Sequence, residues 1–280
     1  MPAEAAVVRR PWRWLVLLAV AANIGLNYYS NVYPINGQTM GEVSAKYPTL
    51  LTPAGYAFSI WGLIFLSQLV YAVWQLLPAQ RNHVLPEVLA RPLVVVHLAT
   101  AAWVVLFAYE QIFPSIGVML LILVGLIMVY GRGRRRVLAK AAPAWTSWAT
   151  SLYLGWISVA TVINITIGIQ QVWHPAMGLA ITVSLAMIFI IVVIALIMSR
   201  TNGEFVFALV VAWALVALWM AKLREVPELG WAALAGAVVA VVAGFALHRL
   251  NGRKEPWQIA AEAAAAAEAE IAARRAEPQG

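Results

Sequence analysis

The chain has 280 residues, of which 63% are hydrophobic and 11% are charged, whereas soluble domains carry about 25% charged residues, so the composition indicates a membrane protein. The net charge is +7, but Lys and Arg lie in short stretches between apolar runs, so we assign them to membrane orientation and expect no nucleic-acid partner. The chain has no cysteine and all 12 acidic residues are Glu, which excludes disulfides, thiolate metal sites, Ser-His-Asp triads and aspartyl phosphates, and we predict no enzymatic activity.

Eight apolar runs approach or exceed the ~20 residues that cross a hydrocarbon core of ~30 Å. Backbone groups in hydrocarbon must be paired inside the protein, and strand alternation is absent, so the runs are expected to be helices. They cover residues 14–29, 53–77, 92–111, 115–130, 145–169, 177–199, 205–221 and 230–248. The predicted fold class is all-α: a polytopic membrane bundle of about eight transmembrane helices.

The first run follows Arg9, Arg10 and Arg13 and has two interpretations. A secretory signal could be cleaved near Ala19-Val20-Ala21, which has the small residues that such a site needs. The apolar run, however, continues past that site to Tyr28. We therefore favour a retained membrane helix over a cleaved signal.

The first loop, residues 31–52, is longer than the other loops and carries Pro34, Asn36-Gly37 and Pro48. Such residues favour ordered turns, so we expect no helix here. The loop is either a lid over the outer mouth of a cavity or a plain surface connection, and the sequence leaves both open.

Positive charge is distributed unevenly between the two sets of loops. The termini and the loops on their side hold 16 Lys and Arg residues, and the opposite loops hold 3. By the positive-inside rule both termini are cytoplasmic, which points to the cytoplasmic (inner) membrane. The densest cluster fits this orienting role, although it could also hold an anionic lipid head group; it comprises Arg132, Arg134, Arg135, Arg136 and Lys140.

Three of the predicted helices carry aromatic and polar side chains at helical spacing, so each set shares one face. The stripes are Phe58, Trp61, Phe65 and Gln68 in the second run, Thr100, Trp103, Phe107 and Glu110 in the third, and Tyr153, Trp156, Ala160 and Asn164 in the fifth. Polar side chains in membrane helices commonly form hydrogen bonds between helices, which would explain each stripe by packing alone. Three similar stripes favour a shared cavity with aromatic walls, which would suit a flat apolar ligand.

Two of these segments resemble a known family. Thr52-Pro53-Ala54-Gly55-Tyr56-Ala57-Phe58-Ser59-Ile60-Trp61-Gly62-Leu63-Ile64-Phe65 is similar to the second-helix signature of the tryptophan-rich sensory proteins, also called the TspO/MBR or translocator-protein family. Tyr153-Leu154-Gly155-Trp156, followed by Ala160 and Asn164, matches that family's fifth-helix spacing, and Trp103 and Phe107 resemble its third helix more loosely. The resemblance covers residues 14–169, five helices, and identifies the chain as a longer, divergent member.

The resemblance implies a membrane receptor or sensor that binds tetrapyrroles and other flat hydrophobic ligands in a pocket closed by the first loop. Carried over residue by residue, it implies pocket roles for Phe58, Trp61, Trp103, Tyr153, Trp156, Ala160 and Asn164, to which the stripes add Phe65, Thr100 and Phe107. The family's Pro before Tyr153 is Leu152 here, and the aromatic and basic residues of its sterol pattern are missing after Asn164. Sterol binding is therefore not expected.

The predicted organisation has three parts. Residues 1–169 form the TspO/MBR-like five-helix core, residues 170–249 form three additional transmembrane helices, and residues 250–280 form a cytoplasmic Ala-rich helical tail. A small-residue face in the last span permits close helix contact, within the bundle or between subunits, and we favour packing within the bundle; it comprises Ala232, Gly236, Ala240 and Gly244.

One ionisable residue, His97, lies well inside a predicted span, where such residues are functional candidates. An interhelical hydrogen bond is the favoured role, and an axial haem ligand is the alternative.

No cofactor is assigned, and a porphyrin or haem is expected as a ligand. The expected partners are membrane lipids and a hydrophobic small molecule, with a homodimer or a larger membrane complex possible. Alternative functions are a small-molecule transporter and an accessory subunit of such a complex.

Overall fold

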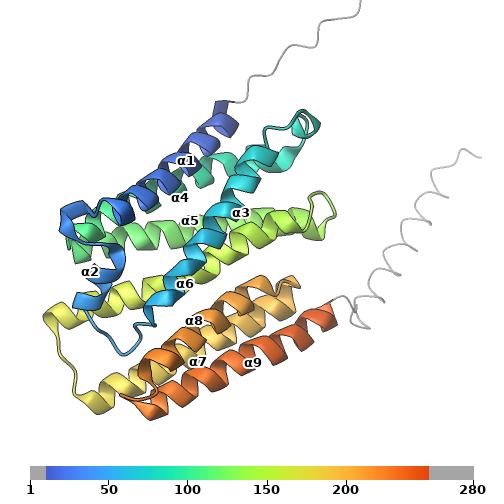
Figure 1. Cartoon of the computed structure of the whole chain (residues 1–280). Helices are drawn as coiled ribbons and strands as arrows, with labels where there is room; N and C mark the ends of the chain where they lie inside the picture. Colours follow the sequence, from blue (N-terminus) through green and yellow to red (C-terminus); the bar gives the residue numbers. More distant parts are fainter. Residues whose placement is uncertain (1–10, 252–280) are drawn as a thin grey trace, which may run out of the picture.

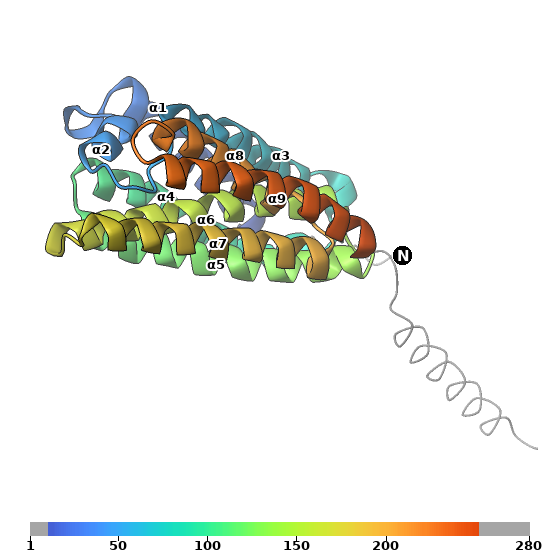
Figure 2. The ribbon, with the colours of Figure 1, turned by 90° about the horizontal axis from the view of Figure 1, so that it is seen from below.

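The structure, a computed structural model, describes residues 11–251 as an all-helical bundle. The helices are α1 (Pro11–Val32), α2 (Met40–Lys46), α3 (Ile60–Trp74), α4 (Val84–Ala108), α5 (Ile112–Leu138), α6 (Trp145–Val172), α7 (Met177–Asn202), α8 (Val206–Lys222) and α9 (Pro227–Asn251). Figure 2 shows that the long helices run along one common direction. The predicted fold class is confirmed. Arg9, Arg10 and the predicted tail helix lie outside the described residues.

Seven helices are long and apolar enough to cross a membrane, where α3 is counted together with the 3-10 turn before it as Gly55–Trp74. The eighth predicted span is the shorter helix α8. Its 17 residues span about 26 Å, slightly less than the ~30 Å hydrocarbon core. It packs against α6, α7 and α9, so most of its surface faces protein. The chain is therefore an integral membrane protein with seven candidate membrane spans among the residues that the structure covers, and α8 packs between them.

The helices fall into two groups joined by α6 (Figure 1). Helices α1, α3, α4 and α5 lie on one side of α6, and α7, α8 and α9 lie together on the other. Glycine allows the close contact between the groups, since a Cβ on Gly155 of α6 would lie 2.9 Å from Val210 of α8. Gly236 and Gly244 of α9 face side chains of α7 and α8, so the small-residue face of the last span packs within the chain, as favoured from the sequence.

Three predicted boundaries were wrong. Helix α4 begins at Val84, because Pro86 lies in the first turn, where a backbone N–H has no helical partner to lose. It continues through Pro92, which a membrane helix tolerates when neighbouring groups satisfy the freed backbone carbonyl. Helix α5 does not end near residue 130 but continues to Leu138, so the arginine cluster is helical. The first loop contains a helix, α2, because Thr39 and Glu42 form a capping box at its start.

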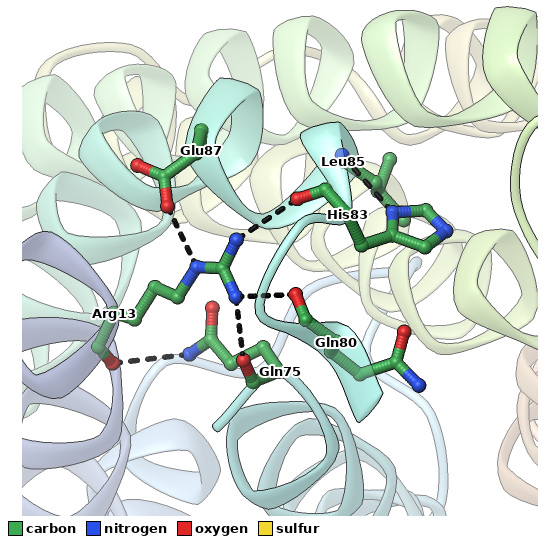
Figure 3. A network of polar contacts seen from close by, with 6 residues as sticks. All are labelled: Arg13, Gln75, Gln80, His83, Leu85 and Glu87. Carbon is green, nitrogen blue, oxygen red and sulfur yellow. Dashed lines mark hydrogen bonds and ion pairs between the residues drawn. The ribbon is translucent and has the colours of Figure 1, made fainter. Parts of the chain in front are cut away.

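A buried arginine joins α1 to the connection between α3 and α4 (Figure 3). The Arg13 side chain is 4% exposed and donates to Glu87 Oε1 at 2.7 Å and to the carbonyl oxygens of Gln75, Gln80 and His83. Gln75 Nε2 returns a hydrogen bond to the Arg13 carbonyl. These contacts fix one end of the bundle, the end where α1 begins and α9 ends (Figure 1).

Candidate functional site

The three aromatic stripes converge between α3, α4 and α6. Phe58 lies edge-on to Trp156, with ring centroids 5.9 Å apart, and Trp61 lies edge-on to Tyr153 at 5.7 Å. From α4, the indole N–H of Trp103 donates to Asn164 Oδ1 at 3.1 Å. Trp61 also stacks on Phe65, with ring centroids 5.1 Å apart, and Trp103 stacks on Phe107 at 4.9 Å, so one face of each indole is covered by protein.

A cavity of about 540 Å³ lies beside these rings, beneath α2. Its walls come from α1, the first loop, α2, α3 and α4. They comprise Ile24, Asn27, Tyr28, Asn31, Thr39, Met40, Gly41, Ser44, Ala45, Thr52, Pro53, Gly55, Phe58, Trp61, Phe65 and Trp103. A narrower space of about 40 Å³ shares several of these walls and reaches α6. The volume of the larger cavity lies within the range of about 300–1,000 Å³ typical of small-molecule sites.

Eight of the ten residues predicted for the site line one or both of these spaces. They are Phe58, Trp61, Phe65, Trp103, Phe107, Trp156, Ala160 and Asn164. The other two, Thr100 and Tyr153, are fully buried behind the wall, where their hydroxyl groups bond to each other. Tyr153 contacts the ring of Trp61 from behind and is itself hydrogen-bonded to Thr100, and neither residue lines the cavity.

A buried polar group links α1 to this wall. Asn23 Nδ2 lies 3.1 Å from His97 Nδ1, which is the interhelical hydrogen bond favoured from the sequence. His97 Nε2 is buried without a partner among the described residues, and the ring stands 5.9 Å from that of Tyr153. Sequence reasoning missed Asn23 and Asn27, although two Asn residues four apart in an apolar helix are a detectable signal.

Helix α2 covers the cavity and is held in place by Glu110, which follows α4. The carboxylate accepts hydrogen bonds from Lys46 Nζ at 2.8 Å, from Tyr47 Oη at 2.6 Å and from Gln38 Nε2 at 3.1 Å. These bonds, led by the one from Lys46, lower the pKa of Glu110 to about 2. The bond to Glu110 also raises the pKa of Tyr47. Glu110 is thus an anchor for the first loop.

Helix α8 holds the turn that precedes α3. The backbone N–H of Ala54 donates to Ala217 O at 3.0 Å, and the indole N–H of Trp213 donates to Ala57 O at 3.1 Å. Tyr56 adds an edge-on contact with Trp213 at 5.3 Å. Helix α8 therefore contributes to the site indirectly. The sequence analysis missed Trp213, whose signal is an indole in the middle of a short apolar helix.

The site is lined mainly by aromatic and aliphatic side chains, with a smaller number of polar groups. The described residues include no group of three or more His, Cys, Asp or Glu side chains that could hold a metal ion. His97 does not line either space. Ring faces and apolar side chains bind flat apolar molecules by stacking and burial, while the polar residues near α2 can meet one polar edge.

Comparison with known proteins gives one match. A family model described as "TSPO-like protein" matches residues 13–246. The matched segment runs from α1 into α9, so it includes α7 and α8 as well as the first five spans. No curated protein and no solved structure matches the chain.

Proposed function

The chain belongs to the family of TSPO-like proteins, and from that premise we propose that it binds a flat hydrophobic molecule, such as a porphyrin or haem, in the cavity beneath α2. The family supports a ligand-binding or sensory role in a membrane. The observation that carries the finer proposal is the cavity of about 540 Å³ lined by Phe58, Trp61, Phe65 and Trp103 and covered by an anchored helix.

The distribution of polar groups supports an amphipathic ligand. The ring walls lie deeper between the helices, whereas Asn31, Thr39 and Thr52 line the cavity near α2 and the first loop. A porphyrin bound there would stack its macrocycle against the indoles and keep its carboxylates at the polar end. Such placement avoids burying charge, which costs several kcal/mol for each unpaired ion.

The proposed role is binding without catalysis, and an axial bond from His97 is not part of it. The His97 ring is fully buried beside Asn23 and is separated from the cavity by its wall. Tetrapyrroles with and without a metal are therefore expected to bind with similar affinity. With both termini cytoplasmic, α2 and the cavity would face the outer side of the inner membrane.

Absorption titration in lipid nanodiscs tests this proposal. Protoporphyrin IX added to the protein is expected to shift and sharpen its main absorption band with a single saturable site. Replacing Trp61 by Ala removes one stacking surface and should weaken binding by about tenfold or more. Ala45→Trp should also weaken it, because Ala45 is exposed on α2 and lines the cavity, so the new ring fills the space without disturbing the core.

Trp148→Ala is the matched control, because Trp148 is 51% exposed and lies outside the cavity. Equal affinities for the parent, Trp61→Ala and Ala45→Trp would refute the assignment. Saturable flux of the porphyrin across proteoliposome membranes would instead favour transport. Stoichiometric recovery of a second protein in mild detergent, without any ligand binding, would favour an accessory subunit.

A further inference from the structure

A second hollow lies on the opposite side of α6, and its chemistry differs from that of the cavity beneath α2. It is a groove of about 680 Å³ walled by α5 and α7 with α6 as its floor. We propose that this groove binds one anionic phospholipid, with the acyl chains along the helices and the head group at the arginine-rich end of α5. The proposal is independent of what the first cavity binds.

The walls of the groove suit hydrocarbon. Ile127 of α5 and Ile190 and Ile194 of α7 are 41–53% exposed, so their side chains form open walls. On the floor, the hydroxyl groups of Ser158 and Thr161 donate to carbonyl oxygens of their own helix. They offer no free donor to a ligand, so the floor behaves as an apolar surface.

The length of the groove matches one leaflet of a bilayer. Its lining on α5 runs from Leu123 to Leu138 and on α7 from Met187 to Asn202. Fifteen residues of rise correspond to about 22 Å along each helix. One leaflet contributes about 15 Å of hydrocarbon, which leaves several ångströms for the glycerol and phosphate.

Positive charge is concentrated at one end. The Arg134 side chain, 7% exposed, donates from Nε to Asn202 O at 2.7 Å and from Nη2 to Gly203 O at 2.7 Å. It thereby joins the end of α7 to α5 and forms the head of the groove. Its hydrogen-bond partners are neutral, but the buried carboxylate of Glu204 lies within electrostatic range of Arg134. The positive charge available to a head group is therefore that of the exposed Arg135.

Arg135 supplies the donors that a phosphate needs. It is exposed, lines the groove, and uses only Nε, which donates to Gly131 O at 3.0 Å. Its terminal nitrogens have no partner within the part of the chain that the structure covers. An arginine with free terminal N–H groups binds a phosphate through paired hydrogen bonds. Tyr130, whose buried hydroxyl likewise lacks a partner among those residues, also lines the groove.

The same charges disfavour a second copy of the chain as the occupant. A two-fold contact in a membrane brings the same surface of both subunits together at the same depth. Arg135 of each subunit would then approach its symmetry mate at low dielectric, which is repulsive. An anionic lipid instead neutralises this end, and the uneven loop charge predicts that the arginines face the cytoplasmic leaflet.

Native mass spectrometry of the full chain, released from mild detergent, tests the proposal. The probes are phosphatidylglycerol and phosphatidylcholine of identical acyl chains. One phosphatidylglycerol is expected to stay bound under activation that removes phosphatidylcholine. Arg135→Gln should weaken its binding about fivefold. Arg132→Gln, which removes the same charge from an exposed residue outside the groove, should change it less than twofold.

Two tryptophan substitutions test separately whether the groove holds the acyl chains of the lipid. Ile127→Trp places an indole in the groove and should abolish the retained lipid, whereas Val124→Trp, at a 53% exposed position of α5 outside the groove, should not. Equal retention of the two lipids would overturn the proposal. Equal losses in Arg135→Gln and Arg132→Gln would overturn it as well, since net charge would then be the cause. Loss of a dimer, without lipid loss, in Ile127→Trp would assign the groove to a second copy.

Discussion

Neutralising Glu110 should release α2 from the cavity. In Glu110→Gln the side chain keeps its size and one acceptor oxygen, and the left-handed backbone at this residue, with φ of 57°, is no worse for Gln than for Glu. The charge and one of the two acceptor oxygens that hold Gln38, Lys46 and Tyr47 are lost. The change therefore probes the anchor and leaves the helix ends alone.

The size of the effect follows from the three hydrogen bonds. The Lys46 side chain is 49% exposed, so its ion pair contributes at most ~0.5 kcal/mol after solvent screening. The partly buried bonds from Tyr47 and Gln38 contribute about 1 kcal/mol each. Gln retains part of this total, so the loss is about 1.5 kcal/mol. A loss of this size raises, by about tenfold, the fraction of molecules in which α2 is displaced from the cavity.

The absence of cysteine from the natural sequence makes the assay direct. Ser44 is buried and lines both spaces, so a single Ser44→Cys thiol reacts with a maleimide only when α2 moves away. Adding Glu110→Gln should accelerate this reaction about tenfold. Glu225→Gln serves as the control, because it breaks the exposed ion pair with Lys222 without touching α2.

The hold of Glu110 on α2 depends on pH. The folded pKa of Glu110, about 2, lies below its ordinary value of 4.5, so the anchor is complete above pH 4.5 and is lost as the pH falls towards 2. The ratio of rates between Glu110→Gln and the parent should therefore shrink as the pH falls from 5 towards 3. A ratio of one at neutral pH, or an equal acceleration in Glu225→Gln, would refute the anchoring role.

Three other substitutions test the packing. Gly155→Ala should lower the free energy of unfolding by about 1–3 kcal/mol, because its Cβ would lie 2.9 Å from a side chain of α8. Gly117→Ala is the control, because a Cβ there would meet nothing within 4 Å, and thermal unfolding in detergent compares the two variants. Arg13→Gln should lower the stability by about 2–4 kcal/mol in the same assay, because it breaks a buried charged network, and an unchanged midpoint would contradict that role. Trp103→Phe removes the bond to Asn164 but keeps an aromatic ring, so it should cost about 1 kcal/mol of stability and weaken porphyrin binding less than Trp61→Ala does.

Much of the fold was predictable because bilayer thickness sets the length of each apolar run, and the helical repeat sets the spacing of side chains that share a face. All eight apolar runs are helices, and the stripes through Trp61, Trp103 and Trp156 meet, as their shared-face spacing indicated. Helix ends were less predictable. Proline breaks most helices, so Pro92 predicts a helix start, yet α4 begins eight residues earlier. Charge usually lies outside the membrane, so the cluster around Arg134 predicts a loop, yet it is helical.

The supporting parts of the site could not be predicted because they depend on contacts distant in sequence. Glu110 meets Lys46 across 64 residues, and Trp213 meets Ala57 across 156. No local periodicity encodes such pairs. The division into a 1–169 core and a separate 170–249 addition stays a prediction, but α8 hydrogen-bonds to the turn before α3, so the second part supports a segment that lines the site.

Ligand protection of a single thiol tests the central claim most directly. In the Ser44→Cys protein, saturating protoporphyrin IX should slow maleimide labelling by more than tenfold, because the ligand would fill the cavity that this side chain lines. A Glu225→Cys reference, at an exposed position on the α8–α9 connection, should label at the same rate with and without the ligand. Unchanged labelling at position 44 while absorption shows the porphyrin bound would place the ligand elsewhere and contradict the account.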